Sequence, residues 1–138
     1  MTNGEKNSVR LSNQVLNFEN NNSWKRLGLI ALSTDFTTER DFARIMPYDL
    51  LGIYVARVAF QNPTTPENLR DMAPRLTNAA RLILSDGPLS AICYSCTAAS
   101  VVIGDDAVTD AIQKSHPGTP VVTPTLAARL AFTALNTT

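Results

Sequence analysis

The stretch LGLIALSTD, residues 27–35, decides the fold, because an apolar run without a break gives way to two hydroxyls and a carboxylate. An apolar run of this kind is typical of a strand that is buried on both faces of a sheet. Three similar runs follow, at residues 53–59, 91–95 and 120–123. The sequence therefore predicts four buried strands.

Helical patterns separate and follow these strands, at residues 39–46, 66–84, 105–114 and 125–135. The second has the best marked start, since Thr65 is suited to cap it and Pro66 suits its first position. Strands that alternate with helices predict an α/β fold, with a four-stranded parallel sheet and helices on both faces. Ligands of such sheets bind at the carboxyl ends of the strands, so site residues are expected there.

The composition fits one domain of 138 residues, with 44% hydrophobic and 17% charged residues. Its net charge of zero argues against nucleic-acid binding as the main activity, because that activity usually leaves a basic surface. No apolar run approaches the ~18 residues of a membrane span. The first residues lack the apolar core of a signal peptide. We therefore expect a cytoplasmic protein with no membrane partner.

The first 23 residues are polar and rich in asparagine, and residues 24–138 carry the strand and helix patterns. We predict a flexible segment over 1–23 and an α/β domain over 24–138. An edge strand or a short docking segment is the alternative for the first part. The apolar residues that would form it are Val9, Leu11, Val15, Leu16 and Phe18.

The loop after the first strand begins with Ser33, Thr34 and Asp35, and two interpretations of it stay open. One is helix capping, which Thr37 or Thr38 would supply alone. The other is an anion cradle, in which backbone N–H groups and hydroxyls bind a carboxylate. The segment has neither glycine nor lysine, which argues against a phosphate loop.

The two cysteines end the third strand and are expected to be free thiols, as reducing compartments disfavour disulfides. Cys93 lies inside the apolar run and is predicted to be a buried small hydrophobe. Cys96 lies at its end, before Thr97, where amides and a nearby helix start would favour the thiolate. A redox pair fits the Cys-x-x-Cys spacing poorly, because one sulfur would sit on the strand. No metal is expected, since a zinc site needs about four ligands and the chain offers the two cysteines and His116.

Four further polar residues have a structural and a functional interpretation. Thr123 precedes the last helix and is either a third wall of the site or a helix cap. His116 is predicted to be an exposed cap at a helix end, at the wrong edge of the sheet to pair with a cysteine. Asp105 and Asp106 are predicted to stabilise a helix start, because adjacent helical residues do not face each other.

Three segments together carry a resemblance to a known family, namely residues 26–35 with 37–39, residues 62–69, and residues 95–100 with 104–106; residues 120–124 support it. They resemble the Asp/Glu racemase superfamily, in the branch of maleate cis-trans isomerase and arylmalonate decarboxylase. Within that branch the chain is most similar to the racemase-like protein of bacterial ectoine-utilisation clusters. The resemblance covers about residues 24–135.

The resemblance implies a racemase, isomerase or decarboxylase that needs no cofactor and acts on a small carboxylate or amino-acid derivative, possibly in ectoine breakdown. Family enzymes use two cysteines, one from each half of a pseudo-symmetric molecule, and Cys96 matches the first. The residues that match the carboxylate-binding positions are Ser33, Thr34, Asp35, Thr97 and Thr123. Asp35 departs from the asparagine of maleate isomerases.

Family chains are roughly twice this length, so the resemblance implies one half of the fold. The partner would be a second half, or a second copy in a homo-oligomer. A non-catalytic carboxylate-binding or regulatory module is the alternative function.

Overall fold

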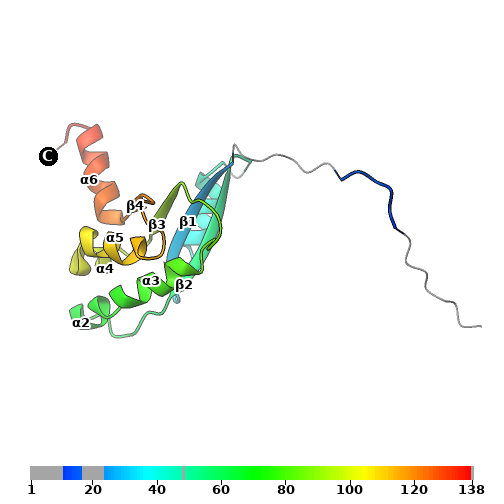
Figure 1. The fold of residues 1–138 in the computed structure, drawn as a ribbon. Coiled ribbons are helices and arrows are strands. Elements are labelled where there is room, and N and C mark those ends of the chain that lie inside the picture. The colour runs from blue at the N-terminus through cyan, green and yellow to red at the C-terminus, as the bar shows by residue number, and fades with distance from the viewer. Residues whose placement is uncertain (1–10, 17–23, 48, 138) are drawn as a thin grey trace, which may run out of the picture.

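The computed structural model describes residues 11–16, 24–47 and 49–137, and it has the predicted α/β architecture. Four parallel strands form one sheet in the order β2-β1-β3-β4 (Figure 1). Their bounds are Lys25–Leu32 for β1, Leu51–Val58 for β2, Ala91–Tyr94 for β3 and Val121–Val122 for β4. The helices are α1 Thr38–Ile45, α2 Pro66–Arg70, α3 Ala73–Arg81, α4 Thr97–Ile103, α5 Asp105–Gln113 and α6 Pro124–Ala134.

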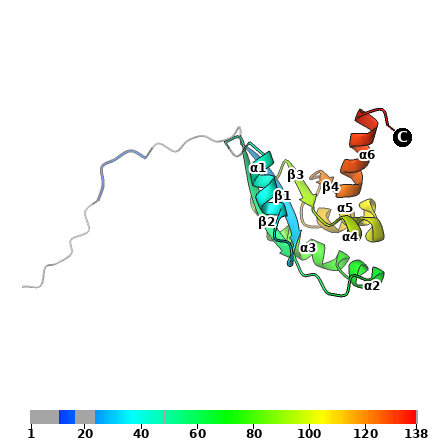
Figure 2. The ribbon, with the colours of Figure 1, turned by 180° about the vertical axis from the view of Figure 1, so that it is seen from behind.

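Helices cover both faces of the sheet, as the alternating pattern predicts. The chain steps from β1 to β2 in one direction and from β2 to β3 in the other, so right-handed crossovers place α1 and α3 on opposite faces (Figure 2). The side chains of β2 also show that α1 lies on the face opposite the main core. Arg57 forms an ion pair with Glu39 of α1, whereas its neighbours Ala56 and Val58 belong to the main core cluster. The other helices of this core lie close together, since α3 contacts α5 and α2 contacts α4.

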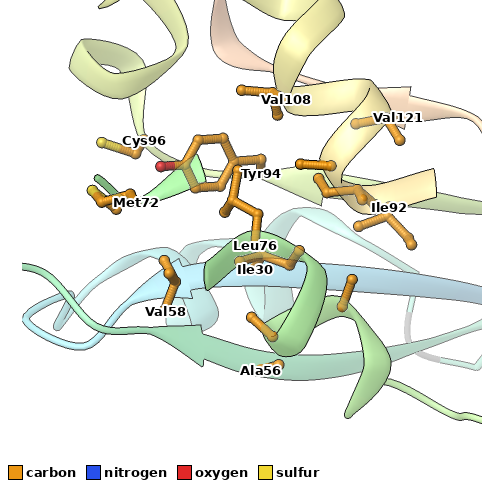
Figure 3. Packing of buried hydrophobic residues seen from close by; sticks show 14 of the residues in the cluster. Ile30, Ala56, Val58, Met72, Leu76, Ile92, Tyr94, Cys96, Val108 and Val121 are labelled. Carbon is orange, nitrogen blue, oxygen red and sulfur yellow. The ribbon is translucent and has the colours of Figure 1, made fainter. Parts of the chain in front are cut away.

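The main core lies between the sheet and the helices α2 to α5 (Figure 3). Ile30, Ile92 and Tyr94 from the strands, with Met72 and Leu76 from the helical side, are all completely buried. Burial of each large aliphatic side chain stabilises the fold by about 1.5–3 kcal/mol relative to exposure. The opposite face is covered less well. Cys93 and Val122 are only half-buried there, while Ile92 and Val121 beside them in sequence are buried.

Gly28 allows the close approach of this core to β1. A methyl group added there would lie 3.0 Å from Cγ1 of Ile92 and 3.3 Å from Cγ2 of Ile83. A glycine in a strand often marks such a close approach. Close packing therefore explains why the apolar run that predicts β1 contains a glycine at position 28.

The helices differ from the prediction in two places. The helix predicted over 66–84 is divided into α2 and α3, which meet at Asp71 and Met72. Pro74 explains the break, because proline lacks an N–H and its ring clashes with the carbonyl four residues earlier. The short helix α4 was not predicted. It begins at Thr97, after Ser95 and the N-cap residue Cys96, and its C-cap is Gly104, whose φ of 91° favours glycine.

The segment predicted to be flexible falls mostly outside the described residues, including Val9 and Phe18. Residues 11–16 have no regular secondary structure, and Leu11, Val15 and Leu16 are exposed. In the part of the chain that the structure describes, no helix is long and apolar enough to cross a membrane.

The last helix, α6, stands at the end of the molecule beyond β4 (Figure 1). It contacts α4, yet none of its residues is buried. Leu130 and Phe132 are more than half exposed, and so is Leu135, which follows the helix.

Candidate functional site

The parallel register brings the expected site residues to one edge of the sheet. Ile30 pairs with Tyr94, and Cys93 pairs with Val122. The residues that follow β1, β3 and β4 therefore emerge side by side at the carboxyl ends of these neighbouring strands. They are Ser33 to Asp35, Ser95 to Thr97, and Thr123.

Ser33 fastens the loop after β1 to the adjacent strand. Its backbone N–H donates to the carbonyl of Val58 at 2.9 Å, and its Oγ accepts a bond of 3.1 Å from the N–H of Phe60. The side chains of Ser33 and Thr34 are exposed at this edge. The loop thus presents two hydroxyl-bearing residues to solvent on a backbone that is tied down.

Asp35 caps α1, whereas the capping interpretation of this loop named Thr37 or Thr38. Its Oδ1 accepts bonds of 2.9 Å from the N–H groups of both Thr37 and Thr38, and its Oδ2 accepts a bond from the Thr38 hydroxyl. Burial raises the pKa of Asp35, but the bonds from Thr38 and Thr37 and the charge of Arg57 lower it more strongly. The net pKa lies below the ordinary value. Capping is therefore correct, but its residue was predicted wrongly.

Arg57 supports the same loop from β2 and was missed at the sequence level. One terminal nitrogen donates to the carbonyl oxygens of Leu32 and Asp35, at 2.9 and 2.8 Å. The other forms an ion pair with Glu39. Its position inside an otherwise apolar strand was the sequence feature that could have indicated a special role for Arg57. The guanidinium holds the loop through its carbonyls while Glu39 balances its charge.

The two cysteines lie on different faces of the sheet. Cys96 is the N-cap residue of α4, is 7% exposed and belongs to the main core cluster with Tyr94 and Met72. Cys93 is half-buried on the opposite face, and burial raises its pKa. The predicted burial of Cys93 was wrong in degree, because helices cover that face only in part. Opposite placement also disfavours a redox pair.

Tyr94 brings a further polar group to this edge and was also missed. Its side chain is completely buried, and its hydroxyl has no hydrogen-bond partner among the described residues. The hydroxyl points toward Cys96 (Figure 3). Burial raises the pKa of Tyr94 strongly, and the neighbouring Cys96 raises it further. A tyrosine inside an apolar strand is typical of a core residue, so the sequence did not indicate that Tyr94 belongs to the site.

The hydroxyl of Thr123 is engaged in structural bonds. It accepts a bond of 3.1 Å from the N–H of Leu126, which caps α6, and it donates to Asp105. Thr125 donates to the same carboxylate. These two bonds lower the pKa of Asp105, with a smaller opposing effect of burial and a further lowering by Arg129. Capping thus accounts for the hydroxyl of Thr123.

Thr97 and His116 take up different positions. Thr97 is exposed as the first residue of α4, directly after Cys96. His116 is half-buried rather than exposed, and its Nε2 lies 2.9 Å from the carbonyl of Ala80 on α3. This bond takes the imidazole away from the cysteines. In the described residues no group of histidine, cysteine and acidic side chains is arranged to hold a metal ion.

Comparison with solved structures identifies the architecture. Maleate isomerase Iso from Pseudomonas putida S16 superposes with a TM-score of 0.63 at 21% identity, over 81% of this chain and 50% of that one. Maleate cis-trans isomerase of Nocardia farcinica, bound to TRIS, superposes with a TM-score of 0.65 at 21% identity, over 81% and 49%. The chain has the maleate isomerase fold. The fold expected from the sequence resemblance is therefore confirmed.

The maleate isomerase fold is present here over about half the length of each solved structure. A cysteine-to-serine variant of the Nocardia farcinica enzyme, with a covalently bound succinylcysteine intermediate, superposes with a TM-score of 0.62 at 20% identity, over 81% and 49%. No protein-family profile and no curated protein matches the chain. At these identities the likeness establishes the fold alone.

Proposed function

We propose that Cys96 is one of two catalytic thiols of a cofactor-independent isomerase or racemase that acts on a small carboxylate. The position of Cys96 carries this proposal. It lies two residues after the end of β3, at the N-cap of α4, on the sheet edge where parallel α/β folds bind ligands and where the loop of Ser33 and Thr34 also lies. The maleate isomerase fold supports the same class of reaction.

In an isomerase reaction the Cys96 thiolate would add to the double bond of a cis dicarboxylate. The new C–S bond takes its electrons from sulfur, and the π electrons move toward the carboxylate as an enediolate. Rotation about the resulting single bond, followed by return of the electrons and loss of the thiolate, gives the trans isomer. No atom or electron is gained or lost overall.

In a racemase reaction the thiolate would instead take the proton from the carbon beside the carboxylate. The electron pair again enters the carboxylate, and a second thiol returns a proton to the opposite face. Both reactions build charge on carboxylate oxygens, which hydroxyls and amides held in a dry site stabilise. Ser33, Thr34 and Thr97 suit this binding best, since their side chains lie at the exposed rim.

Asp35 and Thr123 are weaker members of the proposed binding set. The Asp35 carboxylate already accepts three hydrogen bonds at the start of α1, and its negative charge would repel a substrate carboxylate. The Thr123 hydroxyl already bonds Asp105 and Leu126. We propose that they position the loops around the substrate through these contacts.

The second thiol has to come from elsewhere. Cys93 lies across the sheet from Cys96, and the sequence has no third cysteine. A second half or a second copy of the chain would supply it. A two-fold interface is self-complementary and would set two copies of Cys96 across one cleft. Sedimentation of a monomer at high concentration, together with turnover of maleate, would contradict the second-copy arrangement.

The test is conversion of maleate to fumarate, followed by proton NMR, with mass spectrometry of the cysteine peptides. Cys96→Ser should abolish conversion and any substrate adduct, whereas the matched Cys93→Ser should retain both. Conversion that survives Cys96→Ser would overturn the assignment. The ectoine resemblance makes acetylated diaminobutyrate and aspartate the next substrates to test, with loss of optical activity as the readout.

A carboxylate-binding module is the second candidate, and the burial of Cys96 favours it, because a nucleophile has to reach its substrate. In this case carboxylates would slow alkylation of Cys96 by iodoacetamide with no turnover. The Cys96 thiol would also react no faster than an ordinary buried thiol.

A further inference from the structure

The hydroxyl of Tyr94 is the one buried side-chain polar group without a hydrogen-bond partner in the described part of the chain. Tyr94 is completely buried at the end of β3, two residues before Cys96. Buried polar groups in native proteins nearly always find partners, so an exception calls for an explanation. A phenylalanine would fill the same volume without leaving a hydroxyl unpaired.

The surroundings of this hydroxyl show which group could accept a hydrogen bond from it. Tyr94, Cys96 and Met72 belong to one buried cluster, and the Tyr94 oxygen points to the side where the two sulfurs lie (Figure 3). Interaction with the Cys96 side chain is also one cause of the raised pKa of Tyr94, after burial. The sulfur of Cys96 is therefore the candidate acceptor, since a thioether accepts only weakly.

A neutral thiol is a weak acceptor, but a thiolate is a strong one, because hydrogen bonds to charged groups are shorter and stronger. A hydroxyl that is unpaired beside the thiol is thus placed to pair with the thiolate. We propose that Tyr94 donates a hydrogen bond to the sulfur of Cys96 when this thiol ionises, which makes Tyr94 a positioning residue for the reactive thiolate. This inference deepens the proposed function and rests on it for its catalytic meaning.

Charged side chains are poorly placed to stabilise the Cys96 thiolate. Helix α4 itself has no charged residue. On the elements that contact it, α2, α5 and α6, the charged side chains are exposed except for Asp105, which is engaged by Thr123 and Thr125. They are Glu67, Arg70, Asp105, Asp106, Asp110 and Arg129. Within the described residues, Tyr94 is the buried donor next to the sulfur.

The test compares Tyr94→Phe with its parent in a Cys93→Ala background, so that one thiol titrates. The Cβ chemical shift of Cys96, followed by NMR against pH, reports ionisation without a reagent that has to enter the core. We expect Tyr94→Phe to move the midpoint upward by about one pH unit, a roughly tenfold smaller thiolate fraction. Tyr54→Phe is the matched control, because it removes a hydroxyl from another strand on the same face and should leave the midpoint unchanged.

An unchanged midpoint in folded Tyr94→Phe would overturn the inference, and the hydroxyl would then be a packing residue only. If this variant does not fold, 3-fluorotyrosine answers the same question in a Tyr48→Phe, Tyr54→Phe background. Its more acidic phenol is a better donor and should move the midpoint downward, whereas no movement overturns the inference. Neither readout needs a substrate. A shifted midpoint together with conversion that survives Cys96→Ser would therefore contradict the proposed function alone, and conversion that depends on Cys96 with an unshifted midpoint would contradict this inference alone.

Discussion

The hydroxyl of Thr123 donates a hydrogen bond to the carboxylate of Asp105, and this contact joins the first turn of α6 to the first turn of α5. Thr123 is 1% exposed, and the same oxygen accepts the N–H of Leu126. One buried hydroxyl thus accepts a hydrogen bond from the start of α6 and donates one to a carboxylate on α5. The end of β4 is held by this arrangement.

Thr123→Val should therefore destabilise the protein by about 1–3 kcal/mol, because it removes a helix cap and leaves buried groups unpaired. Urea unfolding followed by circular dichroism measures the change. Thr125→Val is the matched control, since it also loses a bond to Asp105 but uncaps no helix, and its effect should be smaller. Equal losses for both variants would contradict the capping role.

The stability that Asp35 provides should depend on pH. The folded pKa of Asp35 lies below its ordinary value of 3.8, so its contribution is present above that value and is lost as the pH falls through the folded pKa. Asp35→Ala should cost about 0.5–2 kcal/mol at neutral pH, because it removes the carboxylate that caps α1. The difference in unfolding free energy should shrink below about pH 4. A difference that stays constant down to acid pH would exclude an ionised Asp35 as the cause.

Arg57 should control how readily the loop after β1 opens. Phe36 in this loop is 93% exposed, which makes it a chymotrypsin site that is protected mainly by the fixed backbone. Lysine cannot reproduce the forked contacts of arginine. Arg57→Lys should speed cleavage after Phe36 roughly threefold to tenfold, the effect of a lost hydrogen bond. Arg75→Lys, which weakens a single bond to Ala59, should not change this cleavage.

Gly28→Ala should destabilise the sheet by steric overlap. The added methyl group would lie 3.0 Å from a side-chain carbon of Ile92 in a fully packed core, and overpacking typically costs about 1–3 kcal/mol. Gly28→Ala should cost less in an Ile92→Ala background than in the parent, because alanine at position 92 lacks the Cγ1 atom that the new methyl group meets. If Gly28→Ala cost the same in both backgrounds, the overlap with Ile92 would not be the cause.

Much of the architecture follows from local sequence. The strand runs, the helix start at Pro66 and the capping position of Thr123 are visible because each depends on neighbours in the chain. Pro74 also gave a readable signal for the division between α2 and α3, since a proline within a helical pattern marks a break. The candidate position of Cys96 followed from the same logic, as the residue after a strand.

The supporting contacts of the site could not be predicted in this way. Arg57 reaches the carbonyls of Leu32 and Asp35 because β2 pairs with β1 in one particular register. The burial of Tyr94 beside Cys96 likewise depends on how α2 and α4 close over the sheet edge. Such contacts join residues that are far apart in the chain or depend on packing, so spacing along the sequence does not reveal them.

The exposed helix α6 has a consequence for local stability. It has 11 residues, and a helix of this length is marginal in water without tertiary packing. None of its residues is buried. Its amide hydrogens should therefore exchange with deuterium long before those of β1, which means that α6 unfolds and refolds while the sheet stays intact. If a binding partner covered Leu130 and Phe132, hydrogen–deuterium exchange would detect it as slower exchange of the amides of α6 alone.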